Sequence, residues 1–270
     1  MESVNTFMKT LNIFLVYLRM FIGNSFIFLT NKLYLAPIKI LPTKIRKVSF
    51  SIEPTDTVSV MSYNIHTGRD HIYRNSLDKI IADIEMNRQS VLCLQELTIE
   101  LYTHCKDSLG YEYGYYDHNK CILSDFPIID RDIHFFNTAY LDSRTSLISV
   151  CLQHGEEQVC VINTLFSYDI TLLAQMAELK ELQHYIEGKQ LYTDKLVVIG
   201  DFNLSNLSMC KFKSDLAKVL KLDEVLLEET YPSLFPIMPI DKCFTTNMTV
   251  TKSAVIQTYN STHCPICIEF

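Results

Sequence analysis

Apolar residues along the chain occur in two patterns that alternate from one segment to the next. Short apolar runs rich in β-branched residues predict buried strands at residues 57–65, 90–97, 121–129, 146–154, 159–166, 195–200, 241–250 and 264–270. Apolar side chains spaced three or four positions apart instead predict helices at residues 75–88 and 170–187, and a short helix near residues 214–220. The strands therefore outnumber the helices.

Several neighbouring strands are separated by connections that leave no room for a helix. The strands at 146–154 and 159–166, for example, are joined by a turn at residues 155–157. A doubly wound parallel sheet would need a helix between nearly every pair of strands. The pattern therefore favours an α/β fold in which two β-sheets pack face to face and the helices cover their outer faces.

The N-terminal part of the chain has a different pattern. Residues 11–29 are long and apolar enough to span a bilayer, although Arg19 lies among them and costs a nominal ~3 kcal/mol there. Basic residues are more numerous after this segment than before it, so a spanning helix here would leave the rest of the chain in the cytosol. An interfacial helix and a helix packed on the domain are the alternatives. We divide the chain into an N-terminal hydrophobic segment with a basic linker, 1–49, and a domain, 50–270, either membrane-associated and facing the cytosol or cytoplasmic.

Composition and charge restrict the functional classes. The net charge of −7 argues against a general basic surface for nucleic acid, though not against a local basic groove. The nine cysteines are scattered, several of them inside apolar runs, so we expect small buried side chains in a reducing compartment rather than a disulfide framework. Cys264 and Cys267 have the spacing of one half of a zinc site, but no second pair accompanies them.

Polar side chains recur where the predicted strands begin or end. They are Asn64, Glu96, Asp201, Asn203, Asp241 and His263. Each alone is more often a solvated turn residue than a functional one, and Asp and Asn readily form turns. As a set at one end of a sandwich, however, they would provide carboxylate oxygens that suit Mg²⁺ or Mn²⁺, and amide and imidazole protons that suit a phosphate group.

Six motifs strengthen this interpretation because they occur in a fixed order. The motifs are SYNIHTG, LQEL, ILSDFPI, GDFNLS, TYPSLFPIMPID and STHCPICIEF, and the match around them covers residues 58–270. In this order they resemble the endonuclease/exonuclease/phosphatase, or DNase I-like, superfamily. The resemblance implies a four-layered α/β sandwich and hydrolysis of a phosphodiester or phosphomonoester assisted by Mg²⁺ (or Mn²⁺).

The resemblance also implies a role for each polar residue. Glu96 matches the family's metal-binding glutamate, and Asn64 matches the asparagine beside it. Asp201 matches the aspartate that orients or deprotonates the attacking water. The remaining matches are Asn203 for the amide that holds the phosphate, Asp241 for the acid of an Ile-Asp motif, and His263 for the histidine that contacts the scissile phosphate.

Two positions depart from the family pattern. Leu165 stands where the family has His or Tyr near the leaving group, and Thr262 stands where an aspartate before His263 is expected to orient the ring. A positioned general acid or base typically contributes about 10²–10⁴ in rate. We therefore expect weakened catalysis.

Two classes of function follow from these matches. The first is a metal-dependent phosphoesterase whose substrate is nucleic acid or a phospholipid or phosphoinositide, associated with a membrane through residues 11–29. The alternative is an inactive relative that binds a phosphorylated ligand or a protein, for which Leu165 and Thr262 are the main arguments. Retention of the other polar residues favours the enzyme.

Overall fold

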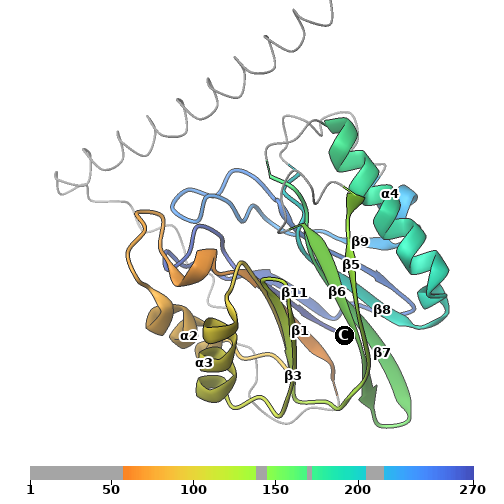
Figure 1. Cartoon of the computed structure of the whole chain (residues 1–270), viewed down its shortest axis with the longest axis horizontal. Coiled ribbons are helices and arrows are strands. Elements are labelled where there is room, and N and C mark those ends of the chain that lie inside the picture. Colours follow the sequence, from red (N-terminus) through yellow and green to blue (C-terminus); the bar gives the residue numbers. More distant parts are fainter. Residues whose placement is uncertain (1–56, 138–144, 169–171, 205–215) are drawn as a thin grey trace, which may run out of the picture. The chain divides into compact units, whose positions relative to one another are not determined.

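The computed structural model describes residues 57–137, 145–168, 172–204 and 216–270 (Figure 1). The predicted N-terminal segment, 1–49, lies outside the described residues, and so does the candidate membrane segment within it. Among the residues that are described, no helix has both the length and the apolar character needed to cross a membrane.

The described residues form twelve strands in two six-stranded sheets. The first sheet has the order β11-β12-β1-β2-β4-β3, and the second has the order β5-β6-β7-β8-β10-β9. The strands of the first sheet are β1 (Ser59–Asn64), β2 (Val91–Gln95), β3 (Tyr113–Asp117), β4 (Lys120–Ser124), β11 (Lys252–Val255) and β12 (Ile266–Glu269). Those of the second are β5 (Ile128–Phe135), β6 (Ser146–His154), β7 (Glu157–Leu165), β8 (Lys195–Asp201), β9 (Asp223–Val225) and β10 (Asp241–Thr246).

Helices cover the outer face of each sheet. They are α2 (Leu77–Met86), α3 (Ile99–Leu109), α4 (Leu172–Gly188) and α6 (Leu216–Leu220), with short 3-10 turns η1 (His66–Gly68) and η3 (Leu191–Thr193). One apolar cluster fills the space between the sheets, a second lies under α2 and α3, and a third lies under α4 and α6. Figure 1 shows α2 and α3 on one side of the two sheets and α4 on the other. The predicted four-layered sandwich is confirmed.

The central strands read as continuous apolar runs because both of their faces are covered. All but the first residue of β8 are buried, for example. The pattern predicted such strands well, but it missed α3, in which only Cys105 and Leu109 are buried. Local signals for α3 were present, since Thr98 accepts a hydrogen bond from the backbone N–H of Leu101 and Gly110 ends the helix at a left-handed φ of 68°.

The strand predicted at residues 121–129 is wrong, because the structure divides it in two. β4 ends at Ser124, whose Oγ accepts a hydrogen bond from the backbone N–H of Phe126 at 2.9 Å. Pro127, which has no N–H to donate to a ladder, follows at once, and β5 begins at Ile128 in the other sheet. The segment therefore carries the chain from one sheet to the other.

The cysteine prediction needs one correction. Cys151 and Cys160 form a disulfide between β6 and β7, with Cα atoms 4.1 Å apart. These two residues are direct partners in the antiparallel register of the hairpin. Each lies four residues from the two-residue turn at 155–156, and this spacing was a signal that the sequence contained. The other cysteines in the described part of the chain are free and buried, as expected.

One buried asparagine ties the two sheets together. Asn163 on β7 donates from Nδ2 to the carbonyl oxygens of Leu94 and Cys121, both at 2.9 Å, and its Oδ1 accepts from Gln95 Nε2 at 2.7 Å. All of these partners belong to the first sheet, whereas β7 belongs to the second. Buried polar groups need such partners, so Asn163 fixes how the two sheets align.

Replacing Asn163 with leucine is expected to lower the free energy of unfolding by about 3 kcal/mol or more, because each buried polar group left without a partner costs about 1–3 kcal/mol. The carbonyls of Leu94 and Cys121 would each lose a donor, and the amide of Gln95 would lose one acceptor but keep Ser62 Oγ at 2.9 Å. Urea unfolding measures the change. The matched control is Gln158→Leu, on an exposed position of the same strand, which should change stability by less than about 0.5 kcal/mol. Equal effects of the two changes would contradict the bridging role.

Candidate active site

The predicted polar residues gather at one end of the sandwich because of the strand directions. β1 and β2 run parallel in the first sheet, so Asn64 at the end of β1 lies beside the end of β2, which Glu96 follows. In the second sheet, Asp241 at the start of β10 is paired directly with Asp201 at the end of β8. The aligned packing of the two sheets then brings both pairs of residues to the same end.

The turn after β8 contains the close approach of Gly200 to β7 and the site residues Asp201 and Asn203. A Cβ atom at Gly200, whose φ is +148°, would lie 2.1 Å from the carbonyl oxygen of Thr164, so only glycine lets β8 approach β7 this closely. The Asp201 side chain then accepts a hydrogen bond from the backbone N–H of Asn203 at 2.9 Å, which forms a turn that holds its carboxylate in place. Asn203 Nδ2 donates to the carbonyl oxygen of Phe166 at 2.9 Å. Its phosphate-binding role stays a prediction.

Asn64 connects the two halves of the site. Its Nδ2 donates to Asp201 Oδ2 at 3.0 Å and to Glu96 Oε1 at 3.2 Å, which holds two carboxylates from different sheets close together. Its Oδ1 accepts from the backbone N–H of His66 at 3.0 Å. The amide therefore faces the carboxylates with its donor side and keeps Glu96 and Asp201 close together, and its part in metal binding stays a prediction.

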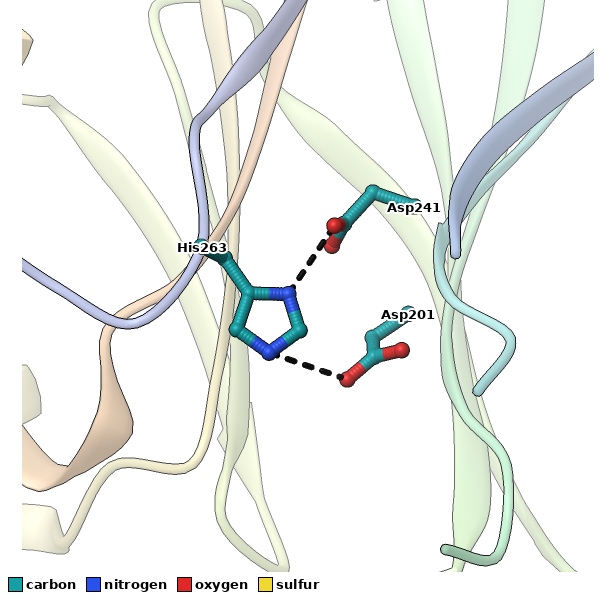
Figure 2. Close-up of side chains that lie close together, drawn as sticks. All are labelled: Asp201, Asp241 and His263. Atoms are coloured by element: carbon teal, nitrogen blue, oxygen red, sulfur yellow. Dashed lines mark hydrogen bonds and ion pairs between the residues drawn. The ribbon is translucent and has the colours of Figure 1, made fainter. Parts of the chain in front are cut away.

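Each ring nitrogen of His263 faces a carboxylate, as Figure 2 shows. Its Nδ1 is 2.9 Å from Asp241 Oδ2, and its Nε2 is 3.7 Å from Asp201 Oδ2. Asp241 Oδ2 also accepts a hydrogen bond from Thr230 Oγ1 at 2.5 Å. All three members of the cluster are buried. The ring is thereby fixed in orientation, with Nε2 directed toward Asp201.

The expectation that Thr262 leaves the histidine without an orienting carboxylate is wrong. Asp241 provides that carboxylate from β10, on the opposite sheet from β12, which follows His263. Neighbouring residues in a sequence rarely pair side chain to side chain in an extended segment, because successive side chains point to opposite faces. Asp241 thus takes the role that was expected of a carboxylate at the position of Thr262.

The charges of the cluster favour a protonated imidazole. Burial alone would lower the pKa of His263, but the carboxylates of Asp241 and Asp201 outweigh it and raise the pKa. Burial also raises the pKa of Asp201, and Asp241 adds to this effect while His263 opposes it. A positive ring between two carboxylates gives each buried charge an opposite partner, as buried charges require.

The residues that hold this cluster in place were not predicted from the sequence. The Tyr231 ring packs on the His263 ring with centroids 4.9 Å apart, and burial raises the pKa of Tyr231 to about 12, so its hydroxyl stays neutral. Ser261 Oγ donates to the carbonyl oxygen of Asn64 at 2.7 Å, and Ser233 Oγ donates to that of Ser261 at 2.5 Å. In the sequence, only the short polar motifs around Asp241 and His263 could have indicated these supporting residues.

Leu165 occupies the position expected from the sequence. It is the last residue of β7, pairs with Asp201 in the parallel register, and is only 3% exposed. The side chain at this position therefore gives the site an apolar wall where a proton donor was expected in the family pattern.

The donor set fits a hard divalent cation. Asp201 and Asp241 each place a carboxylate oxygen within 4.8 Å of the other and of a ring nitrogen of His263, whose protonated ring is not itself a metal ligand. Asp241 Oδ1 is buried and has no hydrogen-bond partner among the described residues. Glu96 adds a further carboxylate next to Asp201 through Asn64. Carboxylate-rich sites of this kind suit Mg²⁺ or Mn²⁺ better than softer metals.

Known proteins resemble this chain in fold. Sphingomyelinase C from Streptomyces griseocarneus is 14% identical, with a TM-score of 0.65 over 80% of this chain and 99% of that chain. A mutant beta toxin from Staphylococcus aureus, whose structure has bound magnesium ions, is 15% identical, with a TM-score of 0.67 over 79% and 99%. Humanized D. rerio TDP2 is 14% identical, with a TM-score of 0.64 over 80% and 99%.

Sequence comparison agrees with the structural one. A UPF0294 protein of Photorhabdus laumondii is 24% identical over 131 residues, which are 47% of this chain and 48% of that protein, so the match spans about half the length of this relative. The model of the Endonuclease/Exonuclease/phosphatase family matches residues 61–263, most of the domain described above. The chain therefore belongs to the endonuclease/exonuclease/phosphatase family.

Proposed function

We propose that the chain is a divalent-metal-dependent phosphoesterase that uses Asp201 and His263 at the reacting phosphate. The observation that carries this proposal is the position of Asp201, which lies between the amide of Asn64 and the imidazole of His263 at the meeting point of both sheets. One carboxylate thereby faces a polar donor, a buried cation and a second carboxylate within one site.

The chemistry of each side chain allows it one role in phosphoester hydrolysis. Asp201 Oδ2 is the acceptor for a proton of the attacking water. His263 Nε2 carries a proton toward the phosphate oxygens, on which negative charge develops as the new bond forms. Asp241 Oδ2 accepts the proton of Nδ1 in a hydrogen bond whose N–O distance is 2.9 Å. This bond keeps the imidazole charged and correctly oriented.

The proposed metal site consists of Glu96 with the carboxylates near it. Mg²⁺ or Mn²⁺, when bound, neutralises phosphate charge and polarises the P–O bond. Asn64 keeps Glu96 and Asp201 close enough to share one substrate phosphate. Leu165 supplies no proton to the leaving group, so we expect the best activity on esters whose leaving groups are stable as anions.

The test is hydrolysis of bis(p-nitrophenyl) phosphate by the full chain with Mg²⁺ or Mn²⁺ present. Addition of EDTA is expected to abolish turnover, and Glu96→Gln is expected to lower it by at least about 10², the range for loss of an electrostatic group at a reacting centre. Glu85→Gln, an exposed glutamate on α2, is the matched control and should leave the rate unchanged. Activity that survives both EDTA and Glu96→Gln would overturn the proposal.

A second candidate is a binding module for phosphorylated ligands. The buried, apolar Leu165 beside Asp201 favours it, because the site then keeps its phosphate-facing groups without a donor for the leaving group. If the chain is such a module, we expect calorimetry to detect metal-dependent binding of inorganic phosphate. We then also expect no turnover of bis(p-nitrophenyl) phosphate.

A further inference from the structure

The exposed large apolar side chains are unevenly distributed over the domain. Among the described residues, seven such side chains are at least 58% exposed. Five of them lie in segments next to the strand ends that carry the site, and we call these five the apolar rim: Tyr73, Tyr168, Leu173, Leu226 and Phe235. A sixth, Tyr259, lies between Thr258 and Asn260, which both donate to Asp83 on α2, and is not part of the rim. The seventh, Met86, is the last residue of α2 and precedes the start of β2, at the opposite end.

Strand directions place the rim around the site. Tyr73 follows the end of β1, Tyr168 follows the end of β7, and Leu173 is in the first turn of α4. Leu226 follows β9, whose last residue pairs with Cys243 near the start of β10. Phe235 lies in the segment that leads to Asp241.

Two rim residues are also linked to the site electrostatically. Burial raises the pKa of Tyr231, whose ring packs on His263, and Tyr168 and Tyr73 add to this rise. Single exposed apolar residues are normal on a protein surface, but a group of them around a polar site indicates an interaction surface. Two of the five are tyrosines, which favour the boundary between an apolar phase and water.

The charges between the rim residues distinguish the partner. The loop at 65–76 contains two exposed arginines, Arg69 and Arg74, and Arg74 is paired with Asp70 at 2.8 Å. The segment at 226–240 contains two exposed glutamates, Glu228 and Glu229, and no basic residue. A nucleic acid needs several cations on the surface that it binds, and these two described segments together supply two arginines, one of them paired. A zwitterionic headgroup, which has both an ammonium and a phosphate, matches this mixture of charges.

We propose that the apolar rim docks the site onto the surface of a zwitterionic phospholipid bilayer. The rim side chains enter the interfacial region, while Arg69 and the glutamates contact the phosphate and ammonium groups. A headgroup phosphate is then presented to Asp201 and His263 from the membrane side. The choice of phospholipid as substrate rests on the phosphoesterase function proposed above, whereas the docking itself does not.

The chain contains no tryptophan, so a single introduced one reports on its own surroundings. The full chain carrying Phe235→Trp is mixed with phosphatidylcholine vesicles whose acyl chains are brominated. We expect a blue shift of the emission and at least about twofold quenching. Met86→Trp, at the opposite end and equally exposed, is the matched control and should show neither change. Both variants contain residues 11–29, so membrane attachment through that segment affects them equally.

Three outcomes separate the possibilities. Equal quenching of the two variants, or no quenching of either, would overturn the docking. Protection of Phe235→Trp from acrylamide by single-stranded DNA, and not by vesicles, would assign the rim to nucleic acid and overturn it as well. Quenching of Phe235→Trp alone supports the docking. Hydrolysis of bis(p-nitrophenyl) phosphate in solution, measured on the same samples, reports separately on the phosphoesterase function.

Discussion

An Asp201→Asn variant is expected to lose at least about 10³ in kcat/KM on bis(p-nitrophenyl) phosphate while it keeps its fold. Asparagine has nearly the same shape but cannot accept a proton from water, and it is a weaker ligand for a hard cation. Asp201 lies within reach of both Asn64 and His263, so the change removes a proton acceptor and a partner of the charged ring together.

Stability should change much less than activity. The variant loses the attraction between Asp201 and His263 but also the repulsion between Asp201 and Asp241, and these terms oppose each other. Thermal unfolding of the variant and the wild type checks this expectation. Asp223→Asn, on an exposed position of β9 at the edge of the sheet, is the matched control for both measurements. A loss of activity smaller than about tenfold would exclude Asp201 as the acceptor.

The positions of the site residues could be predicted because the end of a buried strand can be recognised in a sequence. Asn64, Glu96 and Asp201 each follow a buried apolar run, and parallel pairing brings such ends together at one edge of a sheet. The structure places Asn64 between the carboxylates of the other two, as a site built from strand ends requires. The fold could be predicted for the same reason, since the long central strands have the strongest patterns.

The partners of individual side chains could not be predicted in the same way. His263 pairs with Asp241 and not with a side chain at position 262, and this depends on how β10 is placed against β8 and across from the first sheet. That tertiary contact cannot be predicted from a single sequence. The edge strands β3, β9 and β11 were missed because they are short and only partly buried, so their apolar pattern is weak.

The ion pair between Asp241 and His263 leads to the second large expected effect. Asp241→Asn is expected to lower kcat/KM by about 10²–10⁴, because in the Ser-His-Asp template the loss of the carboxylate that orients the ring costs on the order of 10⁴. The amide can present an N–H group to Nδ1 and so favour the neutral tautomer whose proton is on Nε2, without the positive charge. His263→Gln should lower kcat/KM by a similar or larger factor.

A double variant distinguishes a cooperating pair from two independent residues. If Asp241 acts only through the ring, the Asp241→Asn change should add little once His263→Gln is present, because residues that act as a unit are strongly non-additive. Thr262→Val is the matched control and should stay within about twofold of wild type, because the orienting carboxylate comes from Asp241 at 2.9 Å. Additive losses from the two changes, or a large loss from Thr262→Val, would show that the ring is oriented by another group and that Asp241 serves the site in a different way.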